Sequence, residues 1–224
     1  MKISQLTLYT QNLVRQKAFY EQTLGVTLTG ETPTSVDLLL GKTVLTFIEK
    51  TDATPYHFAI NIPSDCTQEA LTWLKERVAI LTDQDQEVQE FKAWNAQSIY
   101  FYDPDKNIVE FIARRNLGYG SYEPFSAASF VEISEIGMAV SHIAPYYNRL
   151  NRAAGLGLFD GNLKQFSAIG DEYGLFICIN KLLKSWYPTG DKAYASGFEL
   201  SFTENSRNFS VRFRDEILNI KATS

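Results

Sequence analysis

The spacing of hydrophobic and polar residues changes from strand-like to helical and back to strand-like, and this order recurs several times along the chain. Ile3–Thr10 alternates with a period of two, which predicts a strand. A helical spacing follows as far as Leu24, where Gly25 suits the residue after a helix. Three short strand-like runs come next: Val26–Gly30, Ser35–Leu40 and Thr43–Glu49. This first unit is therefore predicted to be a strand, a helix and three strands.

The same order of elements starts again at Tyr56. Tyr56–Ile62 predicts a strand, and Ser64 suits the N-cap of a helix whose apolar residues recur up to Leu81. Three more strands are predicted: Glu87–Phe91, Ser98–Tyr102 and Ile108–Ala113. The last two flank Asp-Pro-Asp-Lys-Asn, which is typical of a turn because proline presets φ and short polar side chains bond their own backbone.

A third unit follows a stretch of different composition. Residues 116–125 are rich in Gly, Ser, Pro and Tyr, and we predict a linker over residues 116–130. Val131–Val140 then predicts a strand, and Pro145 suits the first turn of a helix. Three strands complete this unit: residues 157–159, 165–169 and 175–179.

The fourth unit is predicted to be trimmed, because residues 203–208 are too few for a helix. Its strands are predicted at residues 197–202, 209–213 and 217–220. The register of the repeat can be followed along the chain, since similar residues recur 130 positions apart from Gln5 and Glu135 onward. Equivalent residues on the first strands are Gln5, His57, Glu135 and Gly197. Equivalent residues on the last strands are Thr46, Glu110 and Phe176.

Composition narrows the class of protein. The chain has 224 residues and a net charge of −5, with no basic stripe, which argues against a nucleic-acid partner. No stretch approaches the length of apolar residues that spans a membrane, and the N-terminus lacks the pattern of a signal peptide. Cys66 and Cys178 fit no metal spacing and suit reduced thiols. These features predict a cytoplasmic protein without a membrane partner.

Glu110 is the residue that most needs an explanation. It lies within the apolar run Ile108–Ala113, and a carboxylate there either faces solvent or is held inside for a reason. Nucleophilic catalysis has little support, because the chain has no G-x-S-x-G motif and only two histidines. The phosphate-binding P-loop and the dinucleotide-binding fingerprint are also missing from the sequence.

The repeated units and their motifs resemble the vicinal oxygen chelate superfamily, which includes glyoxalase I, extradiol ring-cleaving dioxygenases, fosfomycin-resistance enzymes and bleomycin-binding proteins. The resemblance is clearest over residues 1–115, in the segments ISQLTLYTQNL, AFYEQTLGV, YHFAINI and YFYDPDKNIVEFIAR. It implies an α+β fold in which tandem βαβββ units form curved, mostly antiparallel half-barrel sheets around a cleft. Residues 1–115 would be one pair of units, and residues 131–224 a second, trimmed glyoxalase-like domain.

The same resemblance implies a site. In that family a divalent metal binds on the cleft floor, between the first strands of two units and the last strand of the second. The matching positions are Gln5, His57 and Glu110, with Glu110 also the candidate catalytic residue. Imidazole and carboxylate suit Fe, Mn, Ni or Zn. Gln5 stands where the dioxygenases have His, although glyoxalase I has Gln there, and Thr46 replaces a further Glu ligand of glyoxalase I. A hydrogen-bonded His–Glu pair in a metal-free cleft is the alternative.

Further candidates follow from the repeat and from aromatic residues. Glu135 has Phe176 and Gly197 in place of would-be partner ligands, so no second metal site is expected. Glu135 is either an acid in the cleft or, as we favour, a surface carboxylate. The aromatic segment 181–193 either covers a cleft or, as we favour, crosses between the third and fourth units. The candidate substrate-binding residues are Tyr9, Phe47, Tyr100, Tyr102 and Trp186.

Two functions are consistent with these features. The first is a metal-dependent lyase, isomerase or dioxygenase, in which the metal binds two vicinal oxygens of a small substrate and stabilises an enolate- or oxyanion-like state. The second is a metal-free binder of a small molecule or drug, like the bleomycin-binding relatives. A role for residues 116–224 in dimerisation or as a lid is compatible with both, so a homodimer is a candidate assembly.

Overall fold

The structure, a computed structural model, describes residues 1–120 and 124–223. Its first unit has the predicted order of a strand, a helix and three strands: β1 (Lys2–Thr10), α1 (Leu13–Ala18) with a π-helical turn (Phe19–Thr23), β2 (Thr27–Thr32), β3 (Ser35–Leu40) and β4 (Thr43–Glu49). Asn12 caps α1 by accepting a hydrogen bond from the backbone N–H of Arg15. Gly25 follows the helical segment with a positive φ of 70°, as predicted for the residue that ends it.

The second unit repeats this order, with a shorter helix than predicted: β5 (His57–Ile62), α2 (Thr67–Lys75), β6 (Ile80–Leu81), β7 (Gln89–Phe91), β8 (Ala96–Tyr102) and β9 (Ile108–Arg114). Leu81 was predicted to be helical, but it pairs with Tyr100 as part of β6. Ser64 was predicted to cap the helix, but its hydroxyl donates a hydrogen bond to the backbone carbonyl of Arg114, and Cys66 is the N-cap residue.

The third unit is complete and the fourth lacks a helix, as predicted: β10 (Glu132–Val140), α3 (Ala144–Ala154), β11 (Leu158–Gly161), β12 (Phe166–Asp171), β13 (Gly174–Asn180), β14 (Phe198–Glu204), β15 (Arg207–Arg214) and β16 (Ile217–Thr223). Two-residue turns with positive φ join β14 to β15 and β15 to β16, so the fourth unit is a meander. Part of the predicted linker, residues 121–123, lies outside the described residues.

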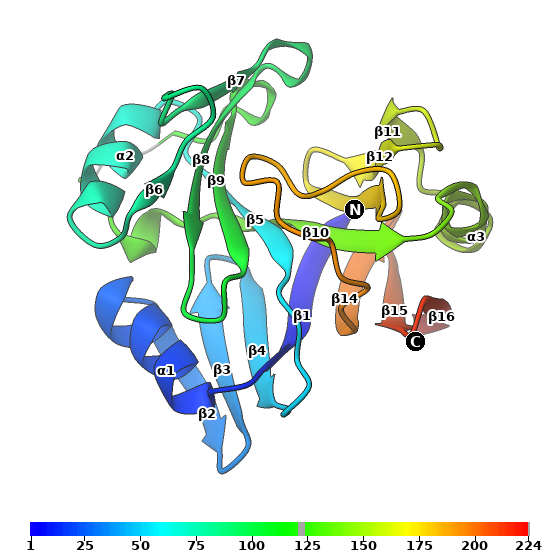
Figure 1. Cartoon of the computed structure of the whole chain (residues 1–224), viewed down its shortest axis with the longest axis horizontal. Coiled ribbons are helices and arrows are strands. Elements are labelled where there is room, and N and C mark those ends of the chain that lie inside the picture. Colours follow the sequence, from blue (N-terminus) through cyan, green and yellow to red (C-terminus); the bar gives the residue numbers. More distant parts are fainter. Residues whose placement is uncertain (121–123, 224) are drawn as a thin grey trace.

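Strand pairing assembles the units into two curved, open sheets (Figure 1). The first and fourth units form a seven-stranded sheet in the order β16-β15-β14-β1-β4-β3-β2. The second and third units form a nine-stranded sheet in the order β11-β12-β13-β10-β5-β9-β8-β6, and β7 pairs with β8. These features are those of the predicted α+β fold class.

The first unit was predicted to pair with the second, whereas the structure places them in different sheets. Strand β1 finds an antiparallel partner in β14 of the fourth unit, and β5 finds one in β10 of the third unit. The hydrogen-bonded sheets therefore extend across the predicted linker. Division of the chain into domains at residues 116–130 stays a prediction.

Alternation along the central strands separates a core face from a site face. Phe58 and Ile60 of β5 belong to the main apolar cluster, which also contains Leu6 and Leu8 of β1 and so joins the two sheets. His57 and Ala59 point to the opposite face of the nine-stranded sheet. Among the described residues, no helix is both long enough and apolar enough to cross a membrane.

Candidate functional site

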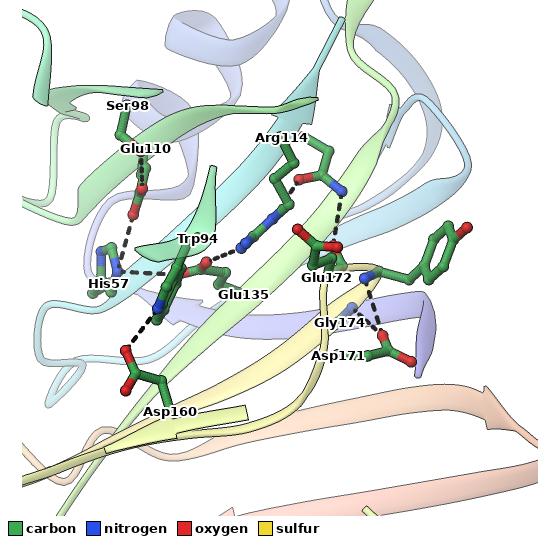
Figure 2. Close-up of polar contacts among 12 residues, drawn as sticks. His57, Trp94, Ser98, Glu110, Arg114, Glu135, Asp160, Asp171, Glu172 and Gly174 are labelled. Carbon is green, nitrogen blue, oxygen red and sulfur yellow. Dashed lines mark hydrogen bonds and ion pairs between the residues drawn. The ribbon is translucent and has the colours of Figure 1, made fainter. Parts of the chain in front are cut away.

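Three buried polar side chains from three neighbouring strands meet on the site face of the nine-stranded sheet (Figure 2). They are His57 of β5, Glu110 of β9 and Glu135 of β10. The pairing register explains why they meet, because Ala59 lies opposite Glu110 on one side and opposite Glu135 on the other. His57 Nε2 lies 3.5 Å from Glu110 Oε2 and 3.9 Å from Glu135 Oε2. One ligand atom from each of the three lies within 4.8 Å of the others, which suits a bound cation.

A backbone hydrogen bond orients the imidazole of His57 toward the two carboxylates. Its Nδ1 lies 3.2 Å from the carbonyl oxygen of Ile108, and because a carbonyl can only accept, Nδ1 carries the hydrogen. The lone pair of Nε2 is then directed at Glu110 and Glu135. Burial lowers the pKa of His57 to about 4, so the ring is neutral at pH 7, as a metal ligand must be.

In each carboxylate, one oxygen is bonded to another side chain and the other oxygen belongs to the three-residue cluster. Oε1 of Glu110 accepts a hydrogen bond of 2.5 Å from Ser98 Oγ, and Oε1 of Glu135 forms an ion pair with the guanidinium of Arg114. Burial raises the pKa of both carboxyl groups. The neighbouring charge of Glu135 raises the pKa of Glu110 further, whereas Arg114 opposes the rise at Glu135.

A cavity of about 450 Å³ opens above this cluster. Most of its walls are aromatic or aliphatic: Phe91, Trp94, Tyr100, Phe166, Ile177, Ile179, Trp186 and Tyr187. The ring of Trp186 packs 5.3 Å from the ring of His57, over Gly137. A Cβ atom at Gly137 would lie 2.8 Å from the indole, so only glycine leaves room for it. A hydrogen bond of 2.8 Å from the Tyr187 hydroxyl to Gln89 ties the same segment to β7.

The structure brings together two of the three predicted ligands. His57 and Glu110 face each other, but Gln5 is exposed on β1 of the other sheet, where its amide bonds the Thr46 hydroxyl at 3.4 Å. The cause is the strand pairing, because the neighbour of β5 is β10 rather than β1. Glu135, interpreted above as a surface carboxylate, is only 2% exposed and is the third member of the cluster with His57 and Glu110. The repeat register, which made Glu135 equivalent to His57, was the signal for it.

The residue of the third unit that is equivalent to Glu110 also differs from the prediction by one position. Ala59 pairs with Glu110 on β9, and Gly137 pairs in the same way with Ile177 on β13. Ile177 is therefore the counterpart of Glu110, and it lines the cavity. Phe176, the predicted counterpart, belongs to the core on the opposite face. The third unit thus contributes one ligand candidate and an apolar wall.

Two of the five predicted substrate-binding residues line the cavity. Tyr100 lies directly opposite Glu110 in the β8–β9 pair, and Trp186 covers His57 within the segment that crosses between the third and fourth units. Phe47 is instead buried in the core, and Tyr9 lines two other pockets. The hydroxyl of Tyr102 forms a hydrogen bond with Asp191 outside the cavity. Tyr187, in the aromatic segment that was a candidate cover of the cleft, also lines the cavity. The wall residues that were not predicted are Phe91, Trp94, Phe166, Ile177 and Ile179.

Comparisons with known proteins agree with this fold. Residues 2–111 match the family model of the Glyoxalase/Bleomycin resistance protein/Dioxygenase superfamily. Over these residues the chain is similar to this superfamily. The resemblance seen in the sequence is thereby confirmed, and its fold extends beyond the matched residues to the third and fourth units.

Solved structures of the superfamily fold align with nearly the whole chain. A candidate dioxygenase from Bacillus subtilis aligns over 99% of this chain and 84% of its own, with a TM-score of 0.64 and 14% identity. A mutant of glyoxalase I from Zea mays aligns over 99% of this chain and 92% of its own, with a TM-score of 0.56 and 14% identity. At this level of identity the likeness shows a shared fold. Among curated proteins, none matches the sequence.

The donor set fits a divalent ion of the kind that this superfamily often binds. One neutral imidazole and two carboxylates suit Mn, Fe, Ni or Zn. The hydrogen bonds to Ile108, Ser98 and Arg114 supply the outer contacts that usually orient metal ligands. In the part of the chain that the structure describes, His57, Glu110 and Glu135 form the one such cluster.

Proposed function

We propose that this protein is a divalent-metal-dependent enzyme acting on a small substrate through two adjacent oxygen atoms. One observation carries the proposal: Nε2 of His57 and one oxygen each of Glu110 and Glu135 converge on the floor of a cavity, while the other polar atoms of the three side chains are bonded to the protein. Three protein ligands would leave coordination positions open for a substrate. A bound ion would supply Lewis-acid polarisation of the substrate oxygens.

The residues around the cluster suit a reaction that moves a proton. Glu110 is the candidate base, because its carboxylate lines the floor of the cavity, within reach of a bound substrate. Tyr100 lies opposite Glu110, and burial holds the pKa of its hydroxyl well above the ordinary value, so the hydroxyl remains a hydrogen-bond donor. The apolar walls would hold the body of the substrate and exclude water. Lyase, isomerase and dioxygenase chemistry are the classes to test.

The cavity itself favours a second candidate function, a metal-free binder of a small molecule. Its volume of about 450 Å³ lies within the ordinary range of ligand pockets, and its walls are mostly aromatic and aliphatic. In this alternative, His57 and Glu110 would interact directly as a buried polar pair. The two functions differ in whether the three polar side chains bind a metal.

Metal content separates the two candidates. We expect protein purified without chelator, or incubated with Mn, Fe, Ni or Zn, to hold about one ion per chain by elemental analysis. Alanine variants at His57, Glu110 and Glu135 should each lose it, because each removes one of three ligands. Gln5→Ala is the matched control, since Gln5 was a predicted ligand and lies in the other sheet.

Two outcomes would contradict the proposal that His57, Glu110 and Glu135 bind a metal. The first is unsubstituted protein that holds no ion after incubation with each of the four metals. The second is loss of metal in Gln5→Ala together with retention in Glu135→Ala, which would place the ligands elsewhere. A metal-free protein that still binds small aromatic molecules with loss in Trp186→Ala would favour the binder.

A further inference from the structure

Arg114 is a buried cation beside the candidate metal ligands. Its side chain has no exposed surface, and strand alternation places it on the same face of β9 as Glu110. From β9 the guanidinium reaches past β5 to Glu135 on β10, where Nη2 forms an ion pair with Oε1 (Figure 2). A buried arginine is found where a charge or a fixed geometry is needed, because its burial is otherwise unfavourable.

The guanidinium is fixed from two sides. Its Nε donates a hydrogen bond of 3.2 Å to Asn61 Oδ1, and Asn61 in turn donates to Glu132 at 3.3 Å. On the other side, Arg114 lies 5.4 Å from the ring of Trp94, which is a wall of the cavity. Trp94 is held by a hydrogen bond of 2.7 Å from Nε1 to Asp160. Arg114 therefore links Glu135 to the cavity wall.

One donor of this guanidinium is left over. Nη1 of Arg114 is buried and has no hydrogen-bond partner among the described residues. An unpaired buried donor lowers stability, so satisfying hydrogen bonds does not by itself account for arginine here. The guanidinium instead pairs with Oε1 of Glu135 and places a positive charge next to two carboxylates.

We propose that Arg114 is a positioning residue for metal binding, which holds Oε1 of Glu135 so that this carboxylate offers only Oε2 to an ion bound at His57 and Glu110. The inference rests on the proposed function. Ser98 has the corresponding effect at Glu110, where its hydroxyl bonds Oε1. Each carboxylate thus contributes one oxygen, and coordination positions remain open for a substrate. Loss of such an outer contact typically weakens metal binding by about 10–100-fold.

Binding of Co²⁺ tests this inference without any substrate. Cobalt affinity and the visible absorption of the bound ion are measured for the unsubstituted protein, Arg114→Met and Arg114→Lys. We expect Arg114→Met to weaken binding by about 10–100-fold and to change the absorption spectrum, because Glu135 becomes free to turn or to offer both oxygens. Arg114→Lys keeps the charge without the planar fork, so an intermediate affinity is expected. Arg152→Met removes the same charge from an exposed position on α3 and should change neither quantity.

A double-mutant cycle separates positioning from a general structural effect. If Arg114 acts through Glu135, then Arg114→Met should weaken binding by less than about threefold when Glu135→Gln is already present. An equal loss in both backgrounds, or a Met variant with unchanged affinity and spectrum, would overturn the inference. Should Arg114→Met fail to fold, as judged by circular dichroism, Arg114→Lys carries the same comparison. Absence of cobalt binding in the unsubstituted protein would instead overturn the proposed function, and this inference with it.

Discussion

At the scale of single residues, small side chains make the site possible. Ala59 lies between Glu110 and Glu135 in the sheet, and its single methyl group leaves the space above it to the two carboxylates. Gly137 does the same for Trp186, whose indole packs where a side chain would stand. The polar cluster and its cover therefore depend on two residues that carry no chemistry of their own.

Gly137 allows a direct test of this packing. In Gly137→Ala the added methyl group would lie 2.8 Å from the Trp186 indole and 3.0 Å from the His57 carbonyl oxygen. We expect the free energy of unfolding to fall by about 1–3 kcal/mol, as is usual for overpacking, and Trp186 to move away from His57. Urea unfolding and acrylamide quenching of tryptophan fluorescence measure the two effects.

The control for this change is Gly157→Ala. A Cβ atom at Gly157 would meet no heavy atom within 4 Å, and its φ is not in the left-handed region. Its unfolding free energy should stay within about 0.5 kcal/mol of the unsubstituted protein. Equal stability and equal quenching in both alanine variants would show that Trp186 does not need the space above Gly137.

The candidate site could be predicted from the sequence only in part. His57 and Glu110 were recognisable because one carboxylate stood in an apolar strand and one of two histidines fell at the matching position of the repeat. The role of Glu135 was missed although its register was known, since that role depends on which strand lies beside β5. Wall residues such as Phe166 come from a unit whose placement the pattern does not determine.

At the scale of elements, the turn between β8 and β9 does more than reverse the chain. Asp103 is buried there and accepts hydrogen bonds from the backbone N–H groups of Asp105 and Asn107. It also accepts hydrogen bonds from Gln16 and Tyr20, which belong to the helical segment of the first unit. The turn composition predicted the reversal, but not this connection, because nothing in a local motif shows which helix will pack on it.

The connection at Asp103 predicts a pH dependence of stability. Burial raises the pKa of Asp103 to about 6, although hydrogen bonds from Asn107 and Tyr20 act in the opposite direction. Because a carboxyl group with a raised pKa binds its proton more tightly in the folded state, its contribution is fully present below about pH 4. That contribution is lost as the pH rises through about 6.

Asp103→Asn should remove this part of the pH dependence. Between about pH 4 and pH 7, the change in unfolding free energy should be smaller in the variant than in the unsubstituted protein by about 2 kcal/mol. Urea unfolding at several pH values measures it, and Asp85→Asn, a like change in an exposed turn, is the control. Parallel stability curves for Asp103→Asn and the unsubstituted protein would contradict the expectation.

At the scale of the whole molecule, the order of strands decides where the site lies. The repeated units were predictable because each carries its own alternation and helix spacing. Their partners were not, since β1 and β5 present similar edges and each can accept more than one neighbour. The structure joins the first unit to the fourth and the second to the third, so Glu135, rather than Gln5, stands beside His57.

This strand pairing predicts that residues 1–115 do not fold by themselves, whereas a domain boundary at residues 116–130 predicts that they do. A fragment of residues 1–115 lacks β14, which pairs with β1, and β10, which pairs with β5, so two central strands become open edges. It also lacks Glu135. We therefore expect the fragment alone to unfold without a cooperative transition and to bind metal far more weakly than the whole chain, whereas adding residues 116–224 should restore both properties. Circular dichroism during thermal unfolding and Co²⁺ titration check this. A fragment that unfolds cooperatively by itself would instead favour residues 1–115 as an independent domain, held together by contacts within the first two units.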